Sequence, residues 1–363
     1  MNSIPHTPTE LPFDSINWVK FITLIGSSHD SLSKYEGILE GIPNTDVLLS
    51  PLTTQEAVIS SKIEGTISTL AEVLEFEADP KELPRSKDIL EIINYRTVLA
   101  YATNYLKKKA ISLNLLLGMH KILLENIRGK NMGAGFFRST QNWIGKEGTP
   151  IEQAIYIPPA PLHLNQLLDN FEKYIHFDEK DRLVQLAIIH AQFEIIHPFN
   201  DGNGRIGRIL IPLFLNEKSL LSSPMFYISA FFEKNKEEYI DRLLAITKEG
   251  DWDGWICFFL NAVVEQANDN IKRVKEILTL YENMKYQITE ITHSQFSIKT
   301  LDTLFRRPIF STTTFINDSQ IPKMSAIRTL KKLTSGIIEV LREGKGNRPT
   351  LYVFKKLIYI ANK

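Results

Sequence analysis

Hydrophobic positions recur every three to four residues along most of the chain, which is the period of an α-helix packed on one side. The clearest case is 181–196, where nearly every position is apolar and a helix buried on most sides is expected. A second helix is predicted to begin at Thr53, because Glu56 three residues later completes a capping-box pattern. Gly65 favours its end just after Glu64. The pattern therefore predicts a mainly α protein.

Two regions depart from this pattern. Between 141 and 161, short β-rich stretches flank a turn-prone segment, which predicts a short β-hairpin between helices. After a charged helix expected at 265–284, short helical pieces precede two strand-like runs, 336–340 and 351–354, joined by a basic turn. Helices followed by a hairpin with a basic tip are the element order of a winged helix-turn-helix.

Charge is unevenly distributed along a chain whose formal net charge is zero over 363 residues. The segment from 286 to the end carries 13 Lys and Arg against 5 Asp and Glu, so the rest of the chain is acidic. A basic terminal module could contact nucleic acid. Its helix at 323–333 places apolar residues at 324, 327, 330 and 333 with Lys and Arg opposite, and Arg342, Lys345 and Arg348 are expected on the wing. Duplex DNA and a protein partner both fit this module.

Membrane insertion and secretion are not expected. No segment approaches the roughly 18 apolar residues that span a bilayer, and the N-terminus lacks a basic flank before an apolar stretch. Cys257 is the only cysteine, so no intrachain disulfide is possible. These features favour a cytoplasmic protein without a membrane partner.

The strongest chemical signal is the segment 197–208, His-Pro-Phe-Asn-Asp-Gly-Asn-Gly-Arg-Ile-Gly-Arg. Glycines around Asn203 allow successive backbone N–H groups to converge, and a helix predicted to start there adds its positive end. Arg205 and Arg208 lie three residues apart and add two cations on one face. The segment is therefore predicted to bind a polyphosphate, with Asp201 as a Mg²⁺ ligand and His197 as a general base for an incoming hydroxyl.

Other phosphate and metal motifs do not fit. Residues 202–207 satisfy the G-x-G-x-x-G pattern, but a helix precedes them where a dinucleotide-binding unit requires a strand. The sequence has no G-x-x-x-x-G-K-[ST] P-loop, no H-E-x-x-H pair and no C-x-x-C cluster.

The segment 197–208 resembles the Fic-domain motif H-P-F-x-[DE]-G-N-G-R-x-x-R at every fixed position. The resemblance extends to 135–145, 157–159 and 250–256, and covers roughly residues 10–265. It implies a protein adenylyltransferase, in which His197 deprotonates a Ser, Thr or Tyr hydroxyl that attacks the α-phosphate of ATP. Pyrophosphate then leaves. Self-modification is common in such enzymes, and the ATP is bound with Mg²⁺ through Asp201.

Further residue roles follow from this resemblance. The implied nucleotide-binding residues are Asp201, Gly202, Asn203, Gly204, Arg205, Ile206, Gly207 and Arg208. Tyr239 lies where relatives often contact adenosine, although a packing role fits equally. The hairpin residues implied to hold the target segment by strand addition are Ile144, Gly145, Ile155, Tyr156 and Ile157. His190 is instead expected to be a buried core histidine.

The stretch 60–65 matches the inhibitory pattern [ST]-x-x-x-E-[GN] found in part of the family. Ser60 and Glu64 are four residues apart and share a helix face. The resemblance implies that Glu64 pairs with Arg208 and diverts it from the ATP γ-phosphate. A solvated helix glutamate is the alternative.

The sequence thus predicts a mainly α Fic helical-bundle fold with a short β-hairpin flap and a C-terminal winged-helix module. Expected domains are an N-terminal helical region at 1–85 with the inhibitory helix at about 53–65, a catalytic core at 86–265, and a linker helix with the winged helix at 266–363. Two other functions stay open: an ATP-sensing DNA-binding regulator with little turnover, and transfer of another phosphate-containing group. Gly204, where a kinase-type variant has Lys, favours AMP. The target and a homodimeric state cannot be derived from the sequence.

Overall fold

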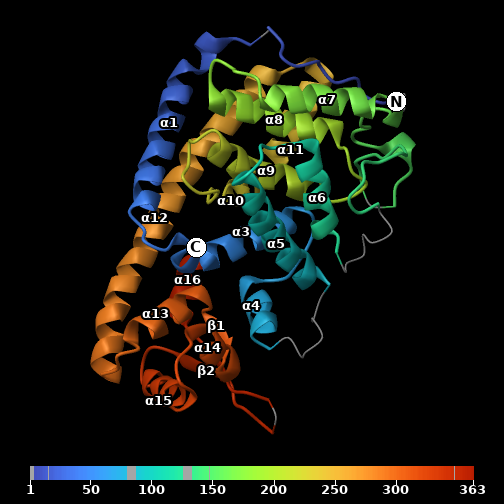
Figure 1. Ribbon diagram of the computed structural model, residues 1–363. Coiled ribbons are helices and arrows are strands. Elements are labelled where there is room, and N and C mark those ends of the chain that lie inside the picture. The colour runs from blue at the N-terminus through green and yellow to red at the C-terminus, as the bar shows by residue number, and fades with distance from the viewer. Residues whose placement is uncertain (1–3, 15, 80–86, 126–132, 147, 347) are drawn as a thin grey trace. The chain divides into compact units, whose positions relative to one another are not determined.

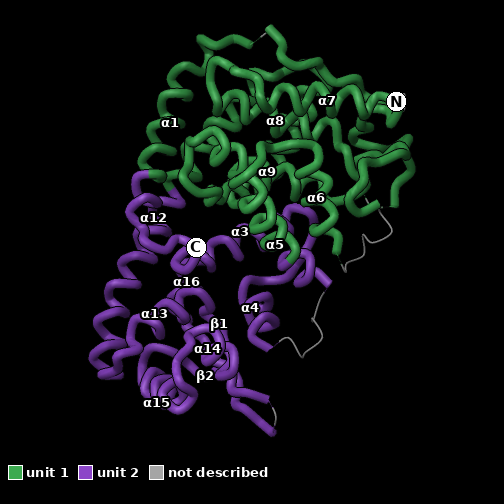
Figure 2. Tube along the Cα trace, viewed as in Figure 1, with its two compact units in different colours: residues 1–36, 94–268 green, residues 37–93, 269–363 purple. Residues whose placement is uncertain are grey.

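A computed structural model describes residues 4–14, 16–79, 87–125, 133–146, 148–346 and 348–363. Helices make up most of these residues (Figure 1), and the predicted mainly α fold is confirmed. The chain forms two compact units, coloured separately in Figure 2. Unit 1 comprises residues 1–36 and 94–268, and unit 2 comprises residues 37–93 and 269–363. The expected domain boundary at 85/86 lies outside the described residues, and the three-domain division stays a prediction.

Three long helices contribute residues to both units: α1 (Trp18–Glu40), α5 (Asp88–Leu106) and α12 (Trp252–Thr292). The sequence predicts α12 only at 265–284, but the helix begins at Trp252. The apolar run that starts at Trp255 is helical and mostly buried, so it forms the first turns of this helix. The remaining helices of unit 1 are α6 (Leu113–Leu123), α7 (Leu164–Ile175), α8 (Arg182–Ile196), α9 (Asn203–Glu217), α10 (Ser229–Lys234) and α11 (Lys236–Glu249), with 3₁₀ turns η2 (Ile151–Gln153) and η3 (Pro161–His163).

Helix α8 is the centre of unit 1 and packs against α7 and α9. Nearly all of its side chains are buried, as the sequence predicts, and the Asp181 carboxylate caps its N-terminus by accepting two backbone N–H groups at 2.9 Å. Gly207 allows α9 to approach α8 closely. A Cβ at this position would lie 2.3 Å from the Glu194 carboxylate oxygen and 3.1 Å from the Phe193 ring.

Unit 2 joins helices from both ends of the chain. They are α2 (Thr45–Leu48), α3 (Ser50–Ile63), α4 (Leu70–Ala78), α13 (Ser297–Arg306), α14 (Thr312–Ser319), α15 (Lys323–Leu333) and α16 (Lys355–Asn362). Three antiparallel strands, β1 (Ile309–Ser311), β2 (Glu339–Arg342) and β3 (Leu351–Val353), form a sheet of order β1-β3-β2. Val353 of β3 pairs with Ile309 on one side and Glu339 on the other. The order from α13 to β3 is that expected of a winged helix, and the assignment itself stays a prediction.

Helix α3 begins earlier than its capping-box pattern suggests. Its N-cap is Leu49, and Pro51 occupies the first turn, where the missing N–H would have no helical partner. The predicted N-cap at Thr53 is therefore wrong. The predicted end is confirmed: Glu64 is the C-cap, and Gly65 has φ +100°, a left-handed conformation that favours glycine. Helix α3 packs against α4, α13 and α16.

The basic C-terminal stretch is partly neutralised within unit 2. Asp79, the C-cap of α4, is buried and pairs with Arg342 and with the Nε of Arg348 at 3.0 Å. Burial raises the pKa of the Asp79 carboxyl, but the two arginines outweigh this effect and lower the pKa below its usual value. Residues 37–93 carry 11 Asp and Glu against 4 Lys and Arg, so part of the positive charge is compensated by the chain itself.

Helix α15 also differs from its expected pattern. Leu330 and Leu333 are buried as predicted, together with Ala326. Met324 is 71% exposed and Ile327 is 40% exposed, so these two apolar residues lie on the solvent side among the basic residues. The expected single apolar face is wrong because the buried stripe follows positions 326, 329, 330 and 333.

Candidate functional site

The candidate base lies at the end of helix α8. His197 is the C-cap of this helix and has φ +49°, a left-handed conformation that is uncommon for a residue with a Cβ. Its Nδ1 lies 3.3 Å from the Glu194 carbonyl oxygen. Because a carbonyl only accepts hydrogen bonds, Nδ1 carries the proton and the lone pair of the neutral ring lies on Nε2. The imidazole is therefore in the tautomer that a general base requires at Nε2.

The anion loop, residues 200–204, follows the segment 197–199 and includes the first two residues of helix α9. Gly202 is the N-cap of α9 with φ +82°, a left-handed conformation that favours glycine, and a Cβ there would lie 2.9 Å from the Leu123 side chain. Without a side-chain cap, the first N–H groups of α9 have no intrahelical partner and can face an anion. The Asn203 side chain is buried and bonds both backbone groups of Phe199, at 2.9 Å and 2.8 Å. It fixes the shape of the loop.

The two arginines of the motif are almost fully buried. Arg205 is 3% exposed and Arg208 is 1% exposed. The Nη2 of Arg205 lies 3.2 Å from Asp201 Oδ1, and the Asp201 side chain is 42% exposed at the rim of the loop. Buried guanidinium groups are expensive unless an anion or several acceptors surround them. A helix N-terminus with two such cations is suited to an oligophosphate.

Two residues of the motif, Ile206 and Gly207, contribute to packing and are not exposed to solvent. Ile206 is fully buried, and the carbonyl of Gly207 lies 3.2 Å from His190 Nδ1. Any contact of these residues with nucleotide would involve the backbone, because neither presents a side chain to solvent. Gly204 is half-exposed at the loop.

His190 is a buried, hydrogen-bonded histidine, as the sequence predicts. Its Nδ1 donates to the Gly207 carbonyl, so its Nε2 accepts from the Tyr239 hydroxyl at 3.0 Å. Tyr239 is 6% exposed and packs against the rings of Phe232 and Trp255. The geometry gives Tyr239 a packing role, and its contact with adenosine stays a prediction.

The side chain of His120 contacts the backbone of the anion loop, and the sequence analysis did not predict this role. The N–H of Gly135 donates to its Nδ1 at 3.0 Å, which makes Nε2 the donor to the Asp201 carbonyl at 3.1 Å. Its ring stacks on Phe199 at a centroid distance of 3.9 Å. One neutral imidazole therefore joins helix α6, the segment before the flap and the anion loop. Its position 81 residues before Asp201 explains why no local pattern reveals it.

Both buried histidines are expected to make the fold acid-sensitive. Burial lowers the pKa of His120 to about 4 and that of His190 to about 3, from 6.5. As pH falls below 6.5, these two histidines become protonated in the unfolded chain but stay neutral in the folded chain. The free energy of unfolding should therefore fall between pH 6.5 and about 4. Each pH unit over which one imidazole stays neutral contributes about 1.4 kcal/mol. Urea titrations across this range should show a shallower pH dependence in His120→Gln than in wild type, and equal slopes would contradict the assignment.

The flap, residues 141–160, contains less β structure than predicted. Within its described residues, one antiparallel bridge joins Ile144 to Tyr156, and the turn continues into η2. The predicted β-hairpin is thus reduced to a single bridge. Ile144 is 38% exposed and Ile155 is 56% exposed, and Gly145 is also exposed, as a surface for an added strand requires. The carbonyl of Ile157 accepts the N–H of His6 at 3.0 Å, so this edge position is already paired.

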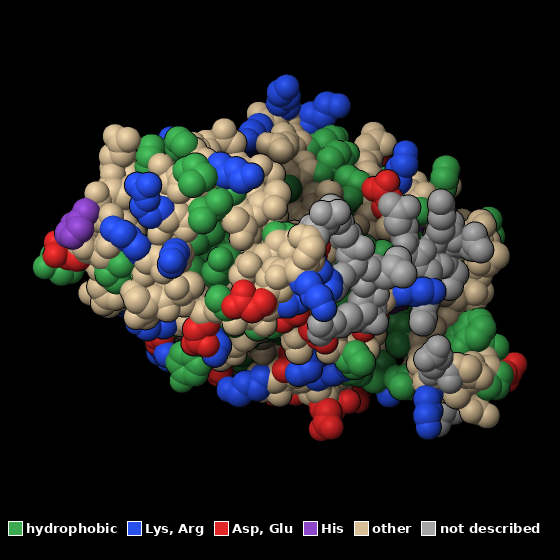
Figure 3. Space-filling view, turned by 90° about the horizontal axis from the view of Figure 1, so that it is seen from below, with side chains coloured by type: hydrophobic (Ala, Val, Ile, Leu, Met, Phe, Trp, Pro, Cys, Tyr) green, Lys and Arg blue, Asp and Glu red, His purple; other side chains and the backbone are tan. Residues whose placement is uncertain are grey.

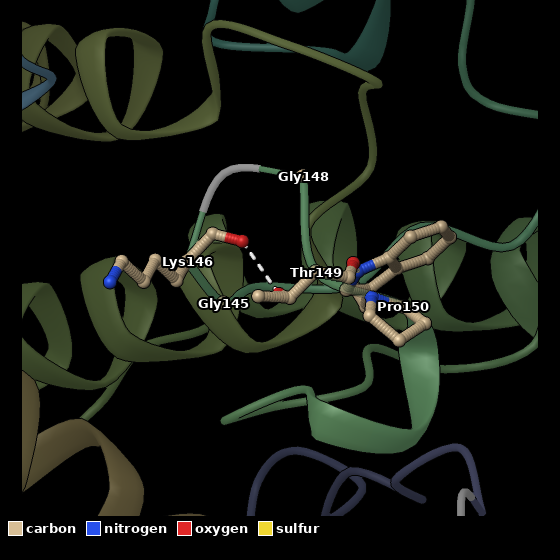
Figure 4. A pocket seen from close by; sticks show the side chains of 6 residues that line it. Gly145, Lys146, Gly148, Thr149 and Pro150 are labelled. Atoms are coloured by element: carbon tan, nitrogen blue, oxygen red, sulfur yellow. Dashed lines mark hydrogen bonds between the residues drawn. The ribbon is translucent and has the colours of Figure 1, made fainter.

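A hollow of about 490 Å³ lies at the tip of the flap (Figure 4), lined by Trp143, Gly145, Lys146, Gly148, Thr149 and Pro150. The Thr149 hydroxyl donates to the Lys146 carbonyl at 2.6 Å, and the Trp143 indole donates to the Thr149 carbonyl at 3.1 Å. These bonds shape the turn beside the exposed apolar residues of the flap.

The predicted inhibitory residues lie in unit 2. Ser60 is fully buried in α3, and Glu64 is exposed at the end of that helix. Arg208 belongs to unit 1. The pairing of Glu64 with Arg208 stays a prediction.

In the part of the chain that the structure describes, no cluster of three or more His, Cys, Asp or Glu could hold a metal ion. Likewise, none of the described helices is long and apolar enough to cross a membrane.

The fold and the site define a mainly helical protein in which a histidine at the end of one helix precedes a glycine-rich loop and two buried arginines. Comparison with known proteins identifies the family. The Fic/DOC family N-terminal model matches residues 22–104 and the Fic/DOC family model matches residues 110–215, which together are more than half of the chain. The chain belongs to the Fic/DOC family.

Relatives and solved structures agree with this assignment. The chain is 34% identical over 206 residues to an Aquifex aeolicus protein named a probable protein adenylyltransferase, covering 54% of this chain and 55% of that protein. It is 27% identical over 198 residues to the protein adenylyltransferase Fic of Drosophila grimshawi, covering 52% and 37%. The chain thus spans about a third to a half of these relatives. A Fic family protein from Desulfovibrio desulfuricans matches 95% of this chain and 98% of its own, with TM-score 0.61 and 17% identity, so the likeness shows the fold.

Proposed function

We propose that this protein transfers AMP from ATP to a Ser, Thr or Tyr hydroxyl of a target protein. The observation that carries the proposal is His197, whose Nδ1–H is held by the Glu194 carbonyl so that Nε2 is basic at the edge of the anion loop. Family relatives named protein adenylyltransferases support it.

Each group in the site has a defined task in this reaction. His197 Nε2 takes the hydroxyl proton, the hydroxyl oxygen forms a bond to the α-phosphorus of ATP, and the bond to pyrophosphate breaks. The first N–H groups of α9 and the guanidinium groups of Arg205 and Arg208 hold the triphosphate and stabilise its charge. Because phosphoryl chemistry depends chiefly on positioning, the rigid support of this loop is the main contribution of the fold.

Mg²⁺ enters with ATP as part of the substrate. The Asp201 carboxylate fits it, because Mg²⁺ is commonly held by one or two carboxylates together with phosphate oxygens. Asp201 is half-exposed at the rim of the loop, where its second oxygen can face solvent, while Arg205 contacts Oδ1. The ion neutralises phosphate charge when bound.

The regulatory part of the proposal is that Glu64 inhibits the enzyme by pairing with Arg208. An exposed carboxylate at the end of a helix that Gly65 terminates is able to reach outside its own helix. A bidentate carboxylate–guanidinium pair would compete with the γ-phosphate for Arg208.

Label transfer tests the reaction. Protein incubated with MgATP should become labelled from [α-³²P]ATP and gain the mass of AMP. Labelling from [γ-³²P]ATP alone would instead identify phosphotransfer, and ATP binding without any labelling would favour the ATP-sensing regulator. Glu64→Gly should be tested in parallel, because inhibition would otherwise hide transfer.

A second function, contact with duplex DNA, is favoured by helix α15. Lys323, Arg328 and Lys331 are exposed, the helix contains no acidic residue, and these three side chains make no ion pair within the described residues. Figure 3 shows several Lys and Arg side chains spread over the left part of the face seen from below. Because Arg342 and Arg348 are bound to Asp79, α15 would make the principal contact.

If α15 binds DNA, Arg328→Gln combined with Lys331→Gln should weaken binding by the full chain and flatten its salt dependence by roughly one unit of slope per lost phosphate contact. Lys356→Gln, at an exposed lysine of α16, is the control and should bind as wild type. Fluorescence anisotropy with mixed-sequence duplex between 50 and 200 mM salt is the measurement. No binding even at 50 mM salt would leave a protein partner as the explanation of the basic helix.

A further inference from the structure

Five consecutive backbone carbonyls, from Ile195 to Phe199, accept hydrogen bonds from the flap and the segment just before it. They run from the last turn of α8, through His197, to Phe199, the residue before the anion loop. The donors are the Tyr156 hydroxyl to Ile195 at 2.8 Å, Arg138 Nη2 to Ile196 at 3.3 Å, Arg138 Nε to His197 at 2.9 Å, the Arg138 backbone N–H to Pro198 at 2.9 Å, and Asn142 Nδ2 to Phe199 at 3.0 Å.

These hydrogen bonds satisfy carbonyl groups that the end of α8 leaves without a helical partner. The last carbonyls of a helix have no partner within it, and they carry the negative end of the helix dipole. His197 departs from helical geometry, so a continued helix cannot satisfy them. A cationic side chain with several donors is the suitable cap, and Arg138 lies at this end.

Arg138, in the segment just before the flap, makes more of these contacts than any other residue described. Its side chain is 3% exposed, and its guanidinium also donates to the Pro159 carbonyl at 2.6 Å and contacts the Thr140 carbonyl at 3.4 Å. It therefore joins the residue just before the flap and the end of the flap to the backbone of His197. Tyr156, which forms the bridge with Ile144, adds a second connection through Ile195.

We propose that Arg138 is a positioning residue that fixes the position of the flap relative to the backbone of His197. A target segment docked along Ile144 would then present its hydroxyl at a fixed distance from Nε2. This inference rests on the proposed AMP transfer. In the proposed reaction, Arg138 contacts neither the nucleotide nor the target, and it acts only through His197 and the flap.

The hydrogen bonds that each substituted side chain can still make determine how strongly each variant should lower the rate of transfer. Arg138→Met preserves much of the length but removes every donor, so the carbonyls of Ile196, His197 and Pro159 lose their guanidinium contacts. Arg138→Lys restores a cation and some of the bonds, but an ammonium cannot match a planar guanidinium that bonds in several directions. Tyr156→Phe removes one hydroxyl and leaves the ring in place. Small displacement at a reacting centre costs about 10²-fold in rate.

The experiment measures self-labelling from [α-³²P]ATP as a function of MgATP concentration, in the wild-type and Glu64→Gly backgrounds. We expect Arg138→Met to lower the maximal rate by about 10²-fold, Arg138→Lys and Tyr156→Phe to lower it less, and the half-saturating MgATP concentration to change less than about twofold. Arg182→Met is the matched control: Arg182 bonds the Lys218 carbonyl at 2.6 Å from the opposite end of α8, and its loss should leave the rate unchanged.

The outcomes separate the inference from the function on which it rests. An unchanged maximal rate in both Arg138→Lys and Arg138→Met overturns the positioning role, as does a loss that appears only as weaker MgATP saturation. If Arg138→Met fails to fold, Arg138→Lys and Tyr156→Phe decide the question by the same measurement. No AMP transfer by wild type or Glu64→Gly overturns the proposed function, and the inference with it.

Discussion

Replacing His197 by alanine should lower the rate of AMP transfer by about 10²–10⁴ while leaving MgATP affinity nearly unchanged. His197 acts on the hydroxyl proton through Nε2, whereas the triphosphate is held by the N-terminus of α9 with Arg205 and Arg208. Removing the imidazole therefore removes proton transfer and keeps the phosphate site. The backbone of residue 197 remains held by Arg138, so the loop should keep its shape.

Rate and affinity must be measured separately to test this. Incorporation from [α-³²P]ATP gives the rate, and titration calorimetry gives the dissociation constant for MgATP. His163→Ala, at an exposed histidine of η3, is the control and should match wild type in both. A His197→Ala protein that transfers AMP at the wild-type rate would remove His197 from the role of base. A large loss of MgATP affinity would mean that the ring contacts the nucleotide.

The anion loop was predictable because its determinants are contiguous. Gly202 is favoured by a local φ of +82°, and the arginine spacing is set by one helix. A short stretch of sequence therefore contains both the backbone shape and the charges. The αL conformation of His197 and its bond to Glu194 were not visible in the sequence, although both fall within four residues.

The groups that support the loop were not predictable, because they come from distant parts of the chain. His120 reaches Asp201 across 81 residues, and Arg138 reaches His197 across 59. A lone histidine in an apolar helix carries no local pattern of its own. Arg138 lies in the stretch 135–145 that resembles the family, but this resemblance does not indicate which backbone groups the arginine contacts. Their roles depend on tertiary packing that brings α6 and the flap to the end of α8.

Errors in the helical prediction have similar causes. The Thr53 capping pattern was misleading because Pro51 and the preceding turn already start α3 at Ser50. On α15, spacing alone placed Met324 and Ile327 with the buried leucines, but the neighbouring elements cover the stripe that contains Ala326. The period of the hydrophobic positions predicts that a segment is helical more reliably than it predicts which face of the helix is buried.

Glu64→Gly is expected to accelerate AMP transfer by roughly 10²-fold or more. Two anions compete for the Arg208 guanidinium in the proposed mechanism: the Glu64 carboxylate and the γ-phosphate of ATP. While Glu64 holds Arg208, ATP can bind but its α-phosphate is not in line with the hydroxyl at His197, and such misplacement costs about 10² in rate. A preference of a few kcal/mol for the inhibited state is enough to give this effect.

Charge and side-chain volume can be separated at this position. Glu64→Gln keeps the size and the helix end at Gly65 but removes the negative charge, so it should also accelerate transfer if the ion pair is the cause. Arg208→Ala should be slower than wild type, since it removes the phosphate ligand together with the inhibitory partner. Initial rates of AMP incorporation for these three variants and wild type test the opposite directions. If Glu64→Gly and Glu64→Gln are no faster than wild type, Glu64 is an ordinary exposed carboxylate at the end of α3 or a group that the reaction needs.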